Sequence, residues 1–135
     1  VYASLESASS SQERAERLLA EIDRTGALDR PVFALFSPTG SGYVNYVASE
    51  TFEYLARGNC ASAAIQYSVL PSALSLTKVG LGADQTRMVV NGIVHRMLAM
   101  PAFSRTISVF WSGTNCSSIA SSRGNERPPA SRSQK

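Results

Sequence analysis

The sequence has little of what metal centres and disulfide-bonded folds require. It contains two cysteines, Cys60 and Cys116, one histidine, His95, and no Cys-x-x-Cys pair. Structural zinc sites need about four Cys or His ligands at short spacings, and small disulfide-bonded domains pair several cysteines. We therefore expect no metal and no cofactor. A single disulfide between Cys60 and Cys116 stays open, because sequence spacing does not place their Cα atoms within bridging distance.

Long apolar runs and a secretion signal are also missing. No uninterrupted run approaches the roughly 20 apolar residues that span a bilayer. The start has no basic region followed by an apolar segment, and the chain begins on Val1 rather than Met. We expect a chain that is soluble as supplied, with upstream sequence removed and with its localisation left open.

Charge is scarce over most of the chain. Charged residues make up 17% and hydrophobic residues 44% of the sequence, and the formal net charge is +3. Such values are near those of soluble globular domains, so neither global disorder nor a fibrous structure is indicated. The excess positive charge lies beyond the last apolar segment, at Arg123, Arg127, Arg132 and Lys135. A Ser-rich end without interleaved aromatics is typical of a solvated tail, so we expect no nucleic-acid partner.

Apolar residues recur at helical spacing in three segments. The predicted helices are residues 11–24, 45–57 and 84–100. Ser10 and Glu13 suit a capping box, and Asn45 suits an N-cap. Gly26 falls where the first helix stops, and Pro101 ends the third one. Each helix has one apolar face and must therefore pack against another element.

Short apolar runs between these helices predict strands that are buried on both faces. The predicted strands are residues 31–36, 61–67 and 106–111. Strands that alternate with helices favour parallel pairing through right-handed crossovers. The fold class is therefore α/β, an incomplete three-layer sandwich with a short parallel sheet. Residues 1–111 are the predicted domain, and residues 112–135, whose one large aliphatic residue is Ile119, form a disordered tail.

Four segments, taken in order, resemble a known family. They are Tyr-Ala-Ser-Leu-Glu-Ser-Ala at 2–8, Ser-Pro-Thr-Gly-Ser-Gly-Tyr-Val-Asn-Tyr-Val at 37–47, Ile-Gln-Tyr-Ser at 65–68 and Pro-Ser-Ala-Leu-Ser-Leu at 71–76. Together they resemble bacterial α/β-hydrolase domains that follow an N-terminal multi-helix membrane region. The resemblance covers about residues 1–105. It implies a serine hydrolase for esters or acyl groups, with lipid-like or envelope substrates and a membrane-anchored intact protein.

The nucleophile of that family is not recognisable here. In the family, the strand matching residues 106–111 leads into a Gly-x-Ser-x-Gly elbow. Here Ser112 follows Trp111 without a glycine two residues before or two residues after it. The triad acid and base follow the nucleophile in this fold, yet beyond Ser112 the chain has Glu126 and no His or Asp. His95 precedes this position within a predicted helix, so we expect it to be structural.

We therefore assign no catalytic residue. The sequence after Arg105 has the character that a frameshift or a misjoined end would produce. The sequence therefore predicts a fragment of a serine hydrolase that is inactive as written. The alternative is a non-catalytic α/β module that binds a ligand or a partner, and an exposed sheet edge would favour self-association in either case.

The resemblance implies an oxyanion or ligand loop at Thr39, Gly40, Ser41 and Gly42. Backbone N–H groups in such a loop stabilise negative charge on a carbonyl oxygen. Turn statistics alone favour a tight turn that needs glycine. A phosphate loop is disfavoured, because no Gly-Lys-Ser/Thr follows and Asn45 stands where a third glycine would fall.

Three polar side chains next to this loop, Tyr43, Asn45 and Tyr46, are candidates for lining a pocket mouth. An aromatic pair beside a helix start is equally typical of core packing. Both readings stay open from the sequence.

Overall fold

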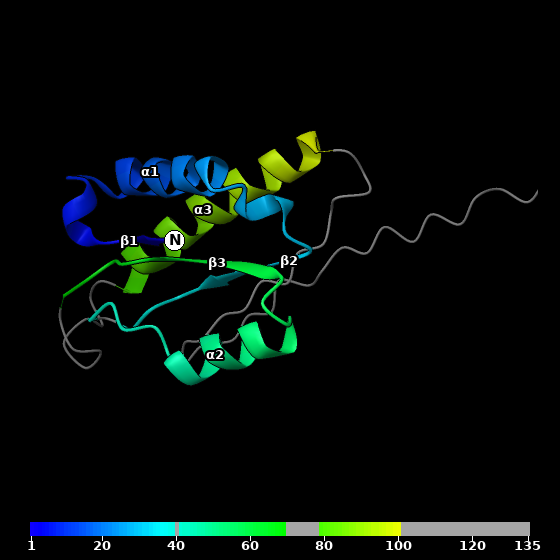
Figure 1. Cartoon of the computed structure of the whole chain (residues 1–135). Helices are drawn as coiled ribbons and strands as arrows, with labels where there is room; N and C mark the ends of the chain where they lie inside the picture. Colours follow the sequence, from blue (N-terminus) through cyan, green and yellow to red (C-terminus); the bar gives the residue numbers. More distant parts are fainter. Residues whose placement is uncertain (40, 70–78, 101–135) are drawn as a thin grey trace, which may run out of the picture.

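A computed structural model describes residues 1–39, 41–69 and 79–100. Within this part of the chain, a parallel sheet with strand order β1-β3-β2 lies between two helical layers. The strands are β1 (Tyr2–Ala3), β2 (Val32–Phe36) and β3 (Cys60–Ile65), and the helices are α1 (Ser11–Arg24), α2 (Tyr46–Leu55) and α3 (Val79–Ala99). Two short 3-10 turns, Leu5–Ser7 and Ala27–Asp29, flank α1. Figure 1 shows α1 and α3 on one face of the sheet and α2 on the other.

The order of the strands explains which face each helix covers. The chain steps from β1 across β3 to β2, and then steps back from β2 to β3. Crossovers between parallel strands are right-handed in nearly all proteins, so steps in opposite directions place the connecting helices on opposite faces. The three-layer α/β fold expected from the sequence is confirmed.

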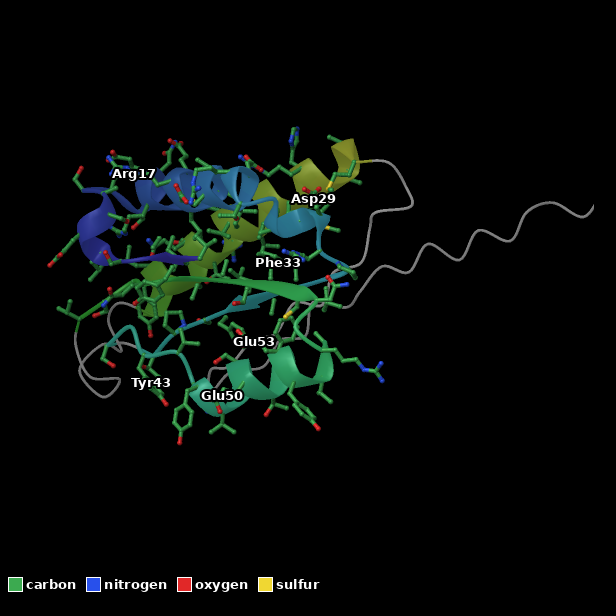
Figure 2. The ribbon with its side chains drawn as sticks, viewed as in Figure 1. Arg17, Asp29, Phe33, Tyr43, Glu50 and Glu53 are labelled. Carbon is green, nitrogen blue, oxygen red and sulfur yellow. The ribbon has the colours of Figure 1, made fainter. Side chains whose placement is uncertain are left out.

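The core consists of two apolar clusters separated by the sheet. Phe33 and Leu35 of β2 face α1 and α3, and Figure 2 shows Phe33 on that side. Ala34 and Phe36 face α2, where the Phe36 and Phe52 rings meet edge to face with centroids 6.1 Å apart. These four β2 side chains are buried, and Val32 at the start of the strand is half-buried. The expectation of a strand buried on both faces is therefore confirmed for β2.

Four elements differ from their predicted bounds. Strand β2 spans Val32–Phe36 instead of residues 31–36, and helix α2 spans Tyr46–Leu55 instead of residues 45–57. Helix α3 begins at Val79 rather than at residue 84, although two glycines lie in its first turn. Gly82 lets the helix approach the Tyr67 ring, since an added Cβ would lie 3.0 Å from that ring. Strand β3 spans Cys60–Ile65 instead of residues 61–67. Tertiary packing thus outweighs the low helix propensity of glycine in α3.

Strand β1 was not predicted at all. It is two residues long, and it forms because Tyr2 and Ala3 pair with Ala64 and Ile65 of β3. Two residues are too few to show a strand period. The predicted strand at residues 106–111 and the tail at 112–135 lie outside the described residues.

A buried arginine links α1 to α3. Arg14 is 8% exposed and donates from Nη1 to the Ala8 carbonyl at 2.9 Å and from Nη2 to Ser11 Oγ at 3.1 Å. In the amide orientation that satisfies both partners, Gln85 of α3 accepts from Arg14 Nε at 3.1 Å and from Nη2 at 3.3 Å. Gln85 is fully buried, and the ion pairs of the described residues do not include Arg14. Neutral acceptors therefore satisfy this buried cation.

We expect Gln85→Leu to lower the free energy of unfolding by about 3 kcal/mol, because a buried charged donor loses its acceptor. Gln85→Glu keeps an acceptor of the same shape and should be far less destabilising near neutral pH. Urea denaturation of both variants measures the difference. Gln12→Leu on the exposed side of α1 is the control, and equal stability of the two Gln85 variants would contradict the role given to this contact.

Candidate functional site

The candidate site lies where the three parallel strands end. Strands β1, β2 and β3 end at Ala3, Phe36 and Ile65, and all three run in the same direction. Ligands of open α/β sheets usually bind at this carboxyl edge. Residues 37–45, the β2–α2 loop, leave the sheet here, and Gly40 lies outside the described residues.

The β2–α2 loop is folded on itself by short backbone hydrogen bonds. The Thr39 amide donates to the Tyr43 carbonyl at 2.9 Å, and the Gly42 amide donates to the Thr39 carbonyl at 2.8 Å. Thr39 Oγ1 and Ser41 Oγ lie 3.0 Å apart. Gly42 has a φ of +87°, a conformation that favours glycine. The tight turn that needs glycine is therefore present at Gly42.

Two residues from neighbouring strand ends hold this loop. The Tyr2 hydroxyl donates to the Gly42 carbonyl at 3.0 Å. Gln66, directly after β3, donates from Nε2 to the Ser41 carbonyl at 3.3 Å and to the Ser68 carbonyl at 2.9 Å. Its Oε1 accepts from the Leu5 amide at 3.3 Å. The Gln66 carboxamide thus joins segments that follow all three strands.

The remaining predicted site residues begin α2. Asn45 Oδ1 accepts from the amides of Val47 and Ala48 at 3.0 and 3.3 Å, so this side chain acts as the predicted N-cap. Tyr43 and Tyr46 are 51% and 60% exposed, so they do not pack in the core. Figure 2 shows Tyr43 next to the amino end of α2. These aromatic rings are therefore accessible beside the loop.

The Tyr2 hydroxyl must be protonated to donate its hydrogen bond to the Gly42 carbonyl. Partial burial raises the pKa of the Tyr2 phenol above its usual value. A raised folded-state pKa means that the neutral, donating form predominates below about pH 10. The contribution of this hydroxyl to folding is present there and is lost as the pH rises through the folded pKa.

The hydrogen bonds described for this loop involve neither His95 nor Cys60. His95 is exposed on α3, and Cys60 has a free, half-buried thiol at the opposite edge of the sheet. Burial raises the pKa of the Cys60 thiol, as does the Glu53 carboxylate, while Arg30 opposes them. The described part of the chain holds no group of three His, Cys, Asp or Glu residues suited to a metal ion.

Two further observations concern the surface. A shallow apolar cavity of about 270 Å³ lies between β1 and α1, bordered by Tyr2, Leu18 and Glu21, and it includes no residue of the β2–α2 loop. Among the helices described, none is both long and apolar enough to cross a bilayer.

Comparison with known proteins fits this architecture. The model of the alpha/beta-hydrolase family matches residues 1–128. The chain therefore belongs to the α/β-hydrolase family, and the resemblance inferred from its four segments is confirmed at that level. The match continues past residue 105, up to which the resemblance was predicted to extend. No curated protein and no solved structure matches the chain significantly.

Sequence reasoning found the loop and its glycines but assigned no role to Tyr2 or Gln66. Both residues stand in segments that carried the resemblance, at 2–8 and 65–68. The signal available for Gln66 was a polar side chain directly after a buried strand, whereas Tyr2 lies within β1, the strand that was not predicted. Which carbonyl that side chain reaches depends on strand order, and sequence spacing does not give it.

Gly42→Ala should destabilise the protein by more than Gly58→Ala. Both glycines have positive φ, +87° and +72°, so each substitution carries a backbone cost of about 1–2 kcal/mol. A Cβ at Gly42 would also lie 2.6 Å from Gln66 Nε2 and 2.7 Å from the Tyr2 hydroxyl, whereas nothing lies within 4 Å of one at Gly58. Overpacking should add about 1–3 kcal/mol at Gly42 alone, measured by urea denaturation. Equal losses at the two positions would contradict the close packing.

Proposed function

We propose that this chain supplies the oxyanion-loop half of a serine hydrolase for esters or acyl groups. The observation that carries this proposal is the position of the β2–α2 loop, folded and held at the carboxyl edge of a parallel sheet in an α/β-hydrolase family member. Lipid-like substrates, a bacterial source and membrane anchoring of the intact protein rest on the sequence resemblance alone.

Within the loop, the backbone donors are unequal. The Thr39 and Gly42 amides are used by the turn itself. The Ser41 and Tyr43 amides donate to none of the described residues. We therefore assign the oxyanion role to the Ser41 amide of the predicted loop and to the amide of Tyr43, which was predicted only to line the pocket mouth. Preorganised amides of this kind stabilise developing negative charge without having to reorient during the reaction.

The proposal includes inactivity of the chain as written. The sequence contains no Gly-x-Ser-x-Gly, and Glu126 is the one acidic residue after Ser112. An oxyanion loop without an activated serine retains only a small part of the catalytic effect. We propose that residues 1–111 form the hydrolase part and that residues 112–135 are a tail of the kind that a frameshift would produce. The alternative function is that of a module that binds a ligand without turnover.

The outer edge of β2 supports one further part of the proposal. Within the described residues, β2 pairs only with β3, so the backbone groups on its other side have no strand partner. An edge left open would favour self-association.

The chain should bind a tetrahedral anion at the β2–α2 loop. In a titration of the ¹⁵N-labelled full chain with ethyl methylphosphonate, we expect the Ser41 and Tyr43 amide resonances to shift, because a phosphonate oxygen resembles the oxyanion of acyl transfer. The amides of the exposed residues Arg57, Gly58 and Asn59, at the other end of α2, are already hydrogen-bonded within the chain and are the control. Shifts absent from the loop, or equal at Gly58, would overturn the oxyanion proposal.

The purified chain should show no hydrolysis of p-nitrophenyl acetate above buffer and no labelling by a fluorophosphonate. The reason is that Ser112 lacks both an elbow and a triad. A Ser112→Ala variant is the matched control and should give the same rate. Hydrolysis that the variant abolishes would identify Ser112 as a working nucleophile and contradict the predicted inactivity.

A further inference from the structure

We propose that Gln66 and Tyr2 are positioning residues that fix two consecutive peptide groups of the β2–α2 loop and so aim the Tyr43 amide at the substrate oxygen. This inference rests on the proposed oxyanion function of the loop. The inference concerns the side chains that hold the loop in place. Neither Gln66 nor Tyr2 was among the residues predicted to form the loop.

The first peptide group joins Ser41 to Gly42. In a trans peptide the C=O and the N–H point in opposite directions, and no cis peptide occurs among the residues that the structure describes. Gln66 Nε2 donates to the Ser41 carbonyl at 3.3 Å, while the Gly42 amide donates to the Thr39 carbonyl at 2.8 Å. Both ends of this peptide group are hydrogen-bonded, so rotation of its plane would break a bond on each side.

The second peptide group joins Gly42 to Tyr43. Its carbonyl accepts from the Tyr2 hydroxyl at 3.0 Å, so its N–H points away from Tyr2. That Tyr43 N–H donates to no described residue. The peptide is thus held at the carbonyl end and presents a fixed donor at the other end, which is the arrangement that an oxyanion requires.

The hydrogen bonds at position 66 require a side chain that donates twice and accepts once, and a carboxamide does both. Gln66 donates to the carbonyls of Ser41 and Ser68 and accepts from the amide of Leu5. A carboxylate could accept but not donate, and an aliphatic side chain could do neither. Gly42 completes the fit, because its missing Cβ leaves the space that Gln66 and Tyr2 occupy.

Three variants of the full ¹⁵N-labelled chain test this inference: Gln66→Glu, Gln66→Leu and Tyr2→Phe. At pH 7, Gln66→Glu places a carboxylate against two carbonyl oxygens, so the Gly42 hydrogen-exchange protection factor should fall about tenfold or more. Below about pH 4, a protonated carboxyl can donate again, and much of the protection should return. Gln66→Leu should lose protection at both pH values. Tyr2→Phe should mainly displace the Tyr43 resonance.

The same variants are then titrated with ethyl methylphosphonate. We expect at least tenfold weaker binding for Gln66→Glu at pH 7, with recovery at low pH that Gln66→Leu does not show. Gln12→Glu on the exposed face of α1 is the matched control and should change neither readout. Unchanged Phe33 protection confirms that the core is intact in each variant.

The outcomes separate this inference from the proposed function. If the wild-type chain binds the phosphonate and the Gln66 variants bind it equally well, or keep full Gly42 protection, the positioning role is overturned and the oxyanion loop stands. If the wild-type loop shows no phosphonate-induced shift, the proposed function fails whatever the variants do. Loss of both protection and binding, with recovery in Gln66→Glu at low pH, supports the inference.

Discussion

The parallel pairing of β3 on both of its sides is the constraint on which the rest of the structure depends. Because β3 is central, its backbone bonds to β1 and β2, and its side chains must fit beneath helices on both faces. Ala63 and Ile65 face α1 and α3, while Ala64 faces α2. Small side chains in this strand allow the two helical layers to approach the sheet closely. A large residue at Ala64 would have to displace α2.

Parallel pairing also brings the functional candidates together. Three strands that run in one direction deliver Ser4, Ser37 and Gln66 to the same edge, although these residues are far apart in the chain. Gln66 can therefore hydrogen-bond to the β2–α2 loop and to the segment after β1 at once. The geometry of the site therefore depends on the order of the strands as well as on the glycine-containing sequence of the loop. On the face of the sheet that α1 and α3 cover, the buried Arg14–Gln85 contact links these two helices. The acceptors of the Arg14 guanidinium are neutral groups and not a carboxylate.

Much of the local structure followed from sequence pattern. Helix α1 has the predicted bounds, and Ser10 Oγ accepts from the Glu13 amide at 3.1 Å as the capping pattern requires. Asn45 caps α2, and Gly26 beyond α1 has a φ of +60°. These features depend on residues within one helical turn of each other, so a single sequence contains the information. By contrast, β1 pairs with β3, and the first turn of α3 packs against Tyr67, and the sequence predicted neither element.

The same division applies to the candidate site. The sequence by itself determined the class of fold, the family, the presence of a glycine-containing loop after a buried strand, and the lack of a Gly-x-Ser-x-Gly motif. Only the tertiary structure decided which loop amides are used by the turn and which side chains hold it. Hydrogen bonds from Tyr2 and Gln66 to the loop join residues 40 and 25 positions apart, and their partners depend on how the strands are ordered in the sheet. Local pattern carries no information on that order, because pairing between distant strands is set by the packing of the whole sheet and its helices.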